Sequence, residues 1–316
     1  MEFAQALFLV VAGHNDRQEH LSRARRLVLK VHLSASLSEG ESVRFLPPIF
    51  GEVRLIVHQF LDRLMHDSGR PIPIFNQNAG SLDRRMDKAE FDRFADAYED
   101  QHRENIAVTG EGPEYFAEYK IKAFREIVDR AGIEVNRICD FGSGIGNSIP
   151  YFRRYFPEAA LTSSDVSERS LALGRQRYPE AGSCVLIENN RIPVEADSFD
   201  VAFSACVFHH IPHREHLTWL RELHRVTRPG GLIAIFEHNP LNPLTVHAVN
   251  TCPFDENARL IFARDLAKRL QAAGWASSRI QYNLFFPRAL ARLRPFENKL
   301  GWLPLGAQYV ATARKV

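Results

Sequence analysis

One short stretch of the chain carries an acid and three regularly spaced glycines. It reads ICDFGSGIGNS, and in it Asp140 is followed by Gly142, Gly144 and Gly146. Apolar residues precede the acid, so we expect a buried strand that ends near Asp140. Glycine accepts positive φ and lets a ligand touch the backbone, and a helix after the loop offers N–H groups and its positive dipole end. The stretch therefore predicts a cradle for a small polar ligand.

Two classes of ligand compete for such a cradle. A dinucleotide-binding loop follows G-x-G-x-x-G, and its third glycine would fall where this chain has Asn147. The pattern here is D-x-G-x-G-x-G, with Asp140 at the strand end. A carboxylate at that place repels a pyrophosphate and attracts a positively charged ligand. The pattern therefore favours a cationic nucleoside over a dinucleotide.

The elements that must position this loop alternate between strands and helices. We expect strands at 137–141, 160–164, 183–187, 201–205, 232–236, 280–286 and 307–315. We expect helices at 113–131, from 147, and at 168–177, 216–227 and 262–274, and a turn at the RPGG segment, 228–231. Such alternation implies right-handed crossovers and a parallel sheet covered on both faces. The expected fold class is α/β: a three-layer, doubly wound, Rossmann-like, mostly parallel sheet with an antiparallel final strand.

The chain divides near residue 85. Residues 1–85 contain one plausible amphipathic helix between Pro and Gly breakers and no chemical motif. One explanation is that Met86 is the natural start and that the preceding segment comes from an over-extended reading frame; a genuine accessory segment is the other. Residues 86–316 are expected to form one domain, with a helical lid at 86–131 and a Rossmann-like core at 132–316.

Composition excludes several classes of function. The chain has 40 basic and 38 acidic residues among 316, a formal net charge of +2, so no global field attracts nucleic acid. No apolar run approaches the roughly 18 residues that span a bilayer, and Glu2 stands where a signal peptide would carry positive charge. Cys139, Cys184, Cys206 and Cys252 form no CxxC pair, so we expect reduced core thiols and a cytoplasmic protein without stable membrane insertion.

Four ordered motifs lie between residues 137 and 240. They are DFGSGIG, LTSSDVSERSLALGRQRYP, IPVEADSFDVAFSACVFHHIP and LRELHRVTRPGGLIAIFEHNP. Together they resemble the class I S-adenosylmethionine-dependent methyltransferases, and within these the small-molecule group that includes the ubiquinone and menaquinone methyltransferases. The resemblance implies S-adenosyl-L-methionine as cofactor and a small molecule as methyl acceptor. It does not extend to residues 1–85.

The resemblance also implies which residues contact the cofactor. Asp165 matches the acid that accepts both ribose hydroxyls, although it could instead only start the next helix. Glu188 stands where the family usually has an aspartate that reaches the adenine amine, and Asn189 is the alternative. Tyr98 and Lys120 are candidates to cover the cofactor, unless they belong to the core, and Lys120 would pair with its methionine carboxylate. The expected set is Asp140, Gly142, Ser143, Gly144, Gly146, Asp165, Val166, Glu188, Asn189, Ala205, Tyr98 and Lys120.

Candidate catalytic residues follow the fourth and fifth strands. Methyl transfer from a sulfonium is an in-line displacement, so alignment and exclusion of water supply much of the acceleration, and a base is needed only when the acceptor must lose a proton. His210, His209 and Glu237 are the candidates, because an imidazole titrates near neutral pH. One of the two histidines must point away, and a structural hydrogen-bonding role is the alternative for each.

The segment HHIPHREH, residues 209–216, also resembles a metal-binding cluster. Pro212 interrupts it, the HExxH spacing is absent, and we expect His213 and His216 at the surface. No metal site is therefore expected from the sequence.

A polar and aromatic segment separates the last two strands. Residues 285–306 combine several arginines with Trp302, Leu303 and Leu305, and we favour plain packing with one substrate-facing edge over a dimer contact.

Two other functions stay open at this stage: a non-catalytic S-adenosylmethionine-binding protein and, less favoured, an NAD-dependent oxidoreductase. Nucleic acid as a substrate is not expected, because no NPPY-like motif is present. The sequence leaves open the acceptor and a homodimer.

Overall fold

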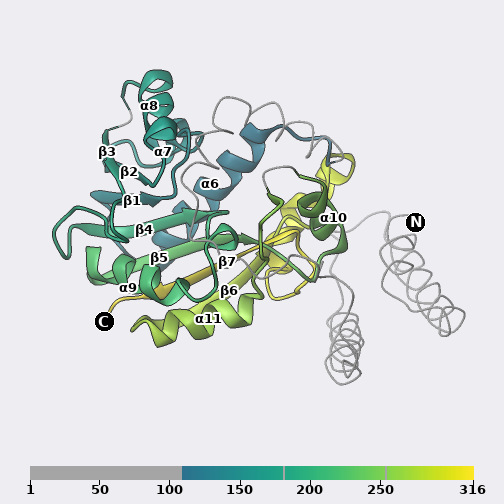
Figure 1. Ribbon diagram of the computed structural model, residues 1–316. Coiled ribbons are helices and arrows are strands. Elements are labelled where there is room, and N and C mark those ends of the chain that lie inside the picture. Colours follow the sequence, from purple (N-terminus) through teal and green to yellow (C-terminus); the bar gives the residue numbers. More distant parts are fainter. Residues whose placement is uncertain (1–108, 181, 253–254) are drawn as a thin grey trace, which may run out of the picture. The chain divides into compact units, whose positions relative to one another are not determined.

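The computed structural model describes residues 109–180, 182–252 and 255–316 (Figure 1). Three of the expectations lie outside the described residues: the start at Met86, the position of Tyr98 and the first part of the lid. The described residues form the part of the chain in which the four motifs lie.

Seven strands form one sheet in the order β3-β2-β1-β4-β5-β7-β6. They are β1 (Arg137–Phe141), β2 (Ala160–Asp165), β3 (Ser183–Leu186), β4 (Phe199–Ala205), β5 (Thr227–His238), β6 (Ala276–Asn283) and β7 (Gln308–Arg314). The pairs among β1 to β5 are parallel, and β7 runs antiparallel to both β5 and β6. The expected mostly parallel sheet with an antiparallel final strand is confirmed.

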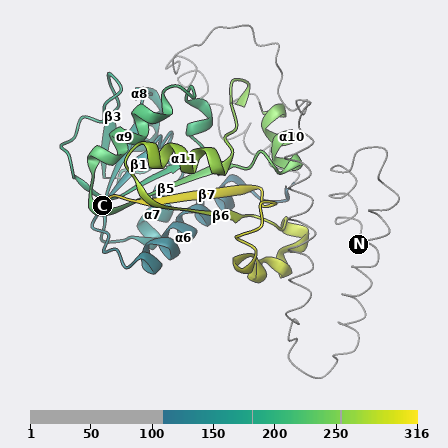
Figure 2. The ribbon, with the colours of Figure 1, turned by 90° about the horizontal axis from the view of Figure 1, so that it is seen from below.

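Helices cover both faces of this sheet, as Figure 2 shows from below. They are α6 (Pro113–Ala131), α7 (Ile149–Tyr155), α8 (Glu168–Arg177), η2 (Phe208–His210), α9 (His216–Val226), α10 (Pro243–Thr251), α11 (Ala263–Ala272) and η4 (Arg288–Lys299). The apolar sides of α6 and α7 join one buried cluster, and those of α9 and α11 join another on the opposite face. The three expected layers are therefore present.

Strand β1 shows how the sequence builds two cores from one sheet. Successive side chains of a strand point to opposite faces. Ile138 accordingly packs in the cluster of α6 and α7, while Cys139 and Phe141 pack in the cluster of α9 and α11. Near-continuous apolar strands are required when both faces of a parallel sheet are buried.

Helix α6 forms where its sequence signals predict. Pro113 occupies the first helical turn, and Gly132 ends the helix in the left-handed conformation with φ of 64°. Ile121, Phe124 and Val128 recur at helical spacing and are buried against the sheet. The helix therefore lies against the sheet through one apolar stripe.

Two expectations about local structure were wrong. The RPGG segment is not a turn before the fifth strand: it lies inside β5 as an irregularity, because the pairing jumps from Phe199↔Thr227 to Val201↔Leu232. The strand expected at 280–286 begins earlier and ends at Asn283, because Leu284 adopts a left-handed φ of 62° that interrupts the ladder.

The order of the strands fixes where a ligand binds. The chain builds β3-β2-β1 outward from β1 and then β4-β5 in the opposite direction, so the winding reverses between β1 and β4. Ligands of such sheets bind outside the carboxyl ends of the strands at this switch point. The glycine loop follows β1 at that place.

Within the described part of the chain, no helix is long and apolar enough to cross a membrane.

Candidate active site

The glycine loop turns back over the end of β2. The backbone N–H groups of Gly142 and Ser143 both donate to the carbonyl of Ser164, at 2.8 and 3.1 Å. Gly142, Gly144 and Gly146 all have positive φ, of 72°, 53° and 81°. Side chains rarely adopt this conformation, so the alternating glycines are required by the backbone.

The three glycines face different surroundings. A Cβ on Gly142 would lie 2.4 Å from Val207, and one on Gly146 would lie 2.5 Å from Ile149. A Cβ on Gly144 would meet nothing within 4 Å. Gly142 and Gly146 therefore serve close packing, whereas Gly144 offers bare backbone to open space, as a ligand-binding position must.

Asp165 joins the loop to the start of α8. Its carboxylate accepts hydrogen bonds from the N–H of Gly144 at 2.8 Å and from the N–H of Ser167 at 2.9 Å. These two bonds orient the carboxylate of Asp165 beside the glycine loop. Val166, the next residue, is half-buried and packs against the core.

Asp140 is buried at the switch point with one carboxylate oxygen unpaired. Its Oδ2 and the hydroxyl of Ser143 have no hydrogen-bond partner among the described residues. Burial, and then the negative charge of Asp165, raise the pKa of Asp140 to about 7. Buried polar atoms are nearly always satisfied, so these two atoms mark a place where a polar, positively charged ligand would complete the structure.

Glu188 and Asn189 form a tight turn at the far edge of the sheet. Asn189 and Asn190 both have positive φ, 50° and 58°, and Glu188 pairs with Arg191 across the turn. Asparagine tolerates this conformation better than most residues, which accounts for the unusual ENN sequence. Glu188 is exposed, and its contact with adenine stays a prediction.

Lys120 and Ala205 lie close to the carboxyl end of β4. Lys120 is half-buried on α6, and its charge acts on the thiol of Cys206. Ala205 is half-buried as the last residue of β4. The neighbouring Tyr119 packs its ring edge against Phe236, and its buried hydroxyl has no partner among the described residues. Helix α6 therefore contacts β5 near its carboxyl end, and its role as part of a lid stays a prediction.

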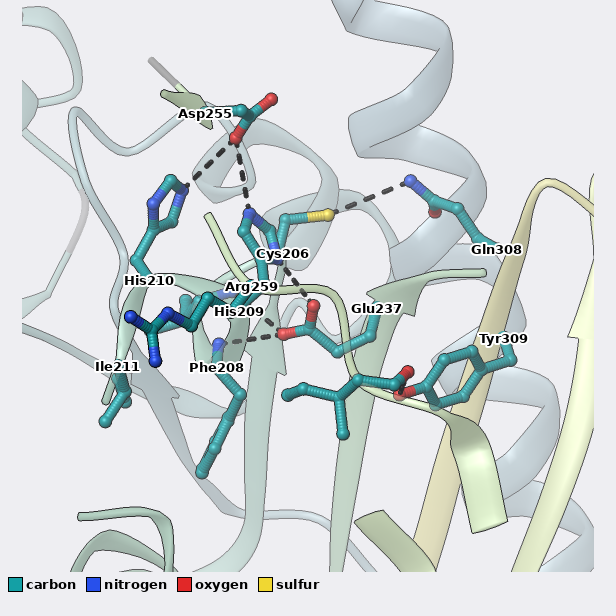
Figure 3. Close-up of polar contacts among 12 residues, drawn as sticks. Cys206, Phe208, His209, His210, Ile211, Glu237, Asp255, Arg259, Gln308 and Tyr309 are labelled. Atoms are coloured by element: carbon teal, nitrogen blue, oxygen red, sulfur yellow. Dashed lines mark hydrogen bonds and ion pairs between the residues drawn. The ribbon is translucent and has the colours of Figure 1, made fainter. Parts of the chain in front are cut away.

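Cys184 and Cys206 were expected to be core thiols, and this interpretation was wrong for both, because each is only half-buried. Cys206 follows β4 with a left-handed φ of 59°. Gln308 donates to its sulfur at 3.8 Å (Figure 3). Burial opposes ionisation, but the positive charges of Lys120 and His238 lower the pKa of Cys206 to about 7. No sequence signal distinguished this cysteine from the buried ones, because the charges come from distant segments.

Glu237 and His209 form a buried ion pair behind the ends of β4 and β5. Glu237 is fully buried; its Oε1 accepts from the N–H groups of Val207 and Phe208, at 3.1 and 2.8 Å, and its Oε2 lies 2.6 Å from Nδ1 of His209 (Figure 3). Burial raises the pKa of Glu237, but His209 outweighs it and the carboxyl pKa is lowered. Both side chains are held by the protein, which favours positioning over proton transfer.

Asp255 completes this cluster, and sequence reasoning missed it. Its Oδ1 lies 3.5 Å from Nε2 of both His209 and His210. Burial disfavours a charged His209 ring, yet Glu237 and Asp255 raise its pKa well above the ordinary value. Burial and the charge of His209 lower the pKa of His210 to about 3. A base works best with a pKa near the operating pH, so neither histidine is tuned as one here.

The other two histidines of the segment lie apart from this cluster. His213 is exposed, as expected. His216 was expected at the surface, but it is fully buried: its Nε2 lies 2.9 Å from the carbonyl of Ile211, and its Nδ1 faces Arg269. The expectation failed because α9 begins at His216 and turns this side chain inward.

The Rossmann-like sheet carries a glycine loop after β1, an acid at the end of β2 and a buried acid at the switch point, the arrangement that the resemblance to the class I methyltransferases predicts. Comparisons with known proteins agree. Residues 139–235 match the family described as a methyltransferase domain. A solved structure from Thermotoga maritima, described as a S-adenosylmethionine-dependent methyltransferase and possible histamine N-methyltransferase, has a TM-score of 0.51 at 18% identity over 73% of this chain and 100% of that chain. That likeness concerns the fold.

Curated relatives point to the same family. The chain is 30% identical over 175 residues to a trans-aconitate 2-methyltransferase of Azoarcus sp. (strain BH72), covering 55% of this chain and 65% of the relative. It is 28% identical over 173 residues to a malonyl-[acyl-carrier protein] O-methyltransferase of Halorhodospira halophila, covering 52% of this chain and 51% of the relative. The matches thus span about half to two thirds of these relatives' lengths. Over the matched residues the chain is similar to S-adenosylmethionine-dependent methyltransferases.

Proposed function

We propose that this protein transfers the methyl group of S-adenosyl-L-methionine to a small-molecule acceptor. The observation that carries the proposal is the pair of features at the switch point: Gly144 offers backbone to open space, and the buried Asp140 keeps one oxygen unpaired. A carboxylate there attracts the positively charged methionine portion of the cofactor. The named relatives are methyltransferases, which supports the same reaction.

Asp165 would orient the ribose in this proposal. Two backbone N–H groups fix its carboxylate beside the glycine loop, where the family's matching acid accepts the two ribose hydroxyls. Because these bonds orient the carboxylate before the cofactor binds, little side-chain entropy is lost on binding. The cofactor supplies the electrophilic methyl group, and the chain would hold this methyl group beside the ends of β4 and β5.

The acceptor would approach from the ends of β4 and β5. Cys206, His210 and His238 lie there, together with Lys120 from α6. The named relatives act on different acceptors, among them trans-aconitate, a malonyl group on acyl-carrier protein and demethylmenaquinone. The proposal therefore commits to a small molecule, and the acceptor atom awaits a screen. The homodimer and the cytoplasmic location stay predictions.

Transfer of labelled methyl groups tests this function. The full chain would be incubated with methyl-labelled S-adenosylmethionine and a cell extract that is then separated into small-molecule, protein and nucleic-acid fractions. We expect label in the small-molecule fraction, none with Asp165→Asn, and unchanged transfer with Asp265→Asn, a surface acid on α11. Label in no fraction would contradict the enzyme and favour a non-catalytic binding protein, and label in nucleic acid would contradict the acceptor class.

A further inference from the structure

We propose that His209, His210 and Asp255 form a binding site for one divalent transition-metal ion of the Zn²⁺ type. Each residue offers one ligand atom, and the three atoms lie within 4.8 Å of one another. In Figure 3 one oxygen of Asp255 faces both imidazole rings. The site goes beyond the proposed methyl transfer and does not depend on it.

The spacing of the ligand atoms suits a metal better than direct hydrogen bonds. Asp255 Oδ1 lies 3.5 Å from Nε2 of each histidine, which is long for an N–H···O bond. Ligands placed about 2.0–2.2 Å from a tetrahedral Zn²⁺ are separated by roughly 3.3–3.5 Å. Two of the three distances between ligand atoms therefore match those around a tetrahedral ion, and the third is within 4.8 Å.

Glu237 presents His209 in the form that a metal requires. An ionised carboxylate only accepts hydrogen bonds, so its Oε2, 2.6 Å away, holds the proton on Nδ1 of His209. A bound ion would replace the proton on Nε2, whose lone pair lies toward Asp255. A carboxylate behind a histidine is the usual outer partner of a metal ligand. The N–H groups of Val207 and Phe208 in turn hold Glu237.

A divalent ion also balances the charges of the cluster. Glu237 and Asp255 bring two carboxylates into a largely buried place, and buried charges require compensation. A divalent ion with two neutral imidazoles neutralises both. Among the described residues, the ring of His238 also faces the cluster, and its centroid is 5.1 Å from that of His209.

The ligand set indicates the kind of ion and its role. Two imidazoles and one carboxylate suit Zn²⁺ and related transition metals, whereas Mg²⁺ prefers oxygen ligands throughout. The side chains of His210 and Asp255 are 18% and 12% exposed, so the site opens to one side. Three protein ligands leave a further position for water or a small molecule, as in catalytic zinc sites.

Metal titration of the tag-free full chain tests this site. After treatment with a chelator and dialysis, calorimetry with ZnCl₂ is expected to show one ion per chain, and MgCl₂ no binding. Asp255→Asn, which keeps the shape of the side chain, should weaken Zn²⁺ at least about 100-fold, and Glu237→Gln by about 10- to 100-fold. His213→Ala removes a nearby exposed histidine and should leave affinity unchanged. A Co²⁺-loaded sample should show the visible absorption of low-coordinate cobalt.

Two results would overturn the site: no Zn²⁺ bound at one per chain by the wild type, or equal affinity in Asp255→Asn and wild type. Circular dichroism of each variant separates loss of ligands from loss of fold. S-adenosylmethionine binding is titrated in the same metal-free samples. A protein that binds S-adenosylmethionine but does not bind Zn²⁺ would reject the metal site alone. A protein that binds Zn²⁺ but does not bind S-adenosylmethionine would reject the proposed function alone.

Discussion

The two ends of the candidate active site differ in how their buried acids are paired. At the cofactor edge, after β1 and β2, Asp140 Oδ2 and the Ser143 hydroxyl are buried without a partner among the described residues. At the acceptor edge, after β4 and β5, both oxygens of Glu237 are engaged, and His209 lies between Glu237 and Asp255. The buried acid of the cofactor edge thus keeps one oxygen without a partner among the described residues, whereas both oxygens of the buried acid of the acceptor edge are paired within the chain.

This difference distinguishes a buried acid that can bind a ligand from a buried acid that holds the fold together. An unpaired buried group is costly in the free protein and gains a partner when a ligand binds, so it supports affinity. A paired buried group keeps neighbouring strands in place, and removing one partner leaves an uncompensated charge. Substitution of Asp140 should therefore mainly change cofactor affinity, and truncation of Glu237 should mainly change stability.

The largest effect is expected at Glu237. Glu237→Ala leaves His209 and the N–H groups of Val207 and Phe208 without their acceptor, and we expect a loss of about 3 to 5 kcal/mol in the free energy of unfolding. Urea denaturation followed by circular dichroism measures it. Asp129→Ala, which breaks the exposed pair with Arg125, is the control and should cost less than about 1 kcal/mol. Equal losses in the two variants would remove the distinction between the edges.

The glycine loop contains the same distinction within three residues. Gly142→Ala forces a Cβ toward Val207, so we expect lower stability, whereas Gly144→Ala has open space and suffers only the backbone strain of about 1–2 kcal/mol. The Cβ on Gly144 occupies the side offered to the ligand, so S-adenosylmethionine affinity should fall roughly tenfold, or about 1.4 kcal/mol. Thermal unfolding and calorimetry on both variants check this. Full cofactor affinity in Gly144→Ala would show that the ligand lies elsewhere.

Cofactor affinity should depend on pH through Asp140. Burial and Asp165 raise its pKa to about 7, so the free protein holds this carboxyl protonated at pH 6 and ionised at pH 8. If the cofactor requires the ionised form, affinity should rise about tenfold from pH 6 to pH 8. Calorimetric titrations at both pH values measure it, and Asp140→Asn should show a flat profile.

The same pKa shift has the opposite effect on folding. The folded state binds the proton of Asp140 more tightly than the unfolded state, whose pKa is near the ordinary value. Its contribution to stability is therefore present below about pH 4 and is lost as the pH rises toward 7. A cofactor affinity that falls over the range in which stability also falls would contradict the assigned role of Asp140.

The smallest effect is expected at Cys206. Lys120 and His238 lower its pKa to about 7 against the effect of burial, whereas burial raises the pKa of Cys184. At pH 7 we expect iodoacetamide to modify Cys206 severalfold faster than Cys184, because the thiolate is the nucleophile. Peptide mass spectrometry follows both sites. Lys120→Ala should slow Cys206 and leave Cys184 unchanged; equal slowing at both would indicate a general loss of structure.

The fold could be predicted from the sequence wherever its causes are local. The β1 bounds and the helix 168–177 match the expectation, because apolar runs, capping residues and breakers lie within a few positions of each other. The RPGG segment failed because its glycines serve a close approach rather than a turn: a Cβ on Gly231 would lie 2.6 Å from the carbonyl of Asp200. Such an approach depends on the neighbouring strand and has no local signature.

The candidate site, too, could be predicted only where its residues lie close together in the sequence. The cofactor edge is built from contiguous motifs, so Asp140 and Gly144 could be singled out from their spacing and Asp165 from the family resemblance; their contact with a cofactor stays a prediction. The acceptor edge brings Asp255 to His209 across 46 positions of sequence, and no spacing rule predicts that contact. The lowered pKa of Cys206 likewise needs Lys120 from a distant helix.

Calorimetric titration of the full chain with S-adenosylmethionine, its demethylated product and NAD tests the central claim most directly. We predict that both adenosyl ligands bind at one per chain, that Asp165→Ala weakens them at least about 100-fold through loss of charge-assisted bonds to the ribose, and that Asp265→Ala binds them like the wild type. NAD should give no heat of binding. Binding of NAD in place of S-adenosylmethionine, or full S-adenosylmethionine affinity in Asp165→Ala, would contradict the account.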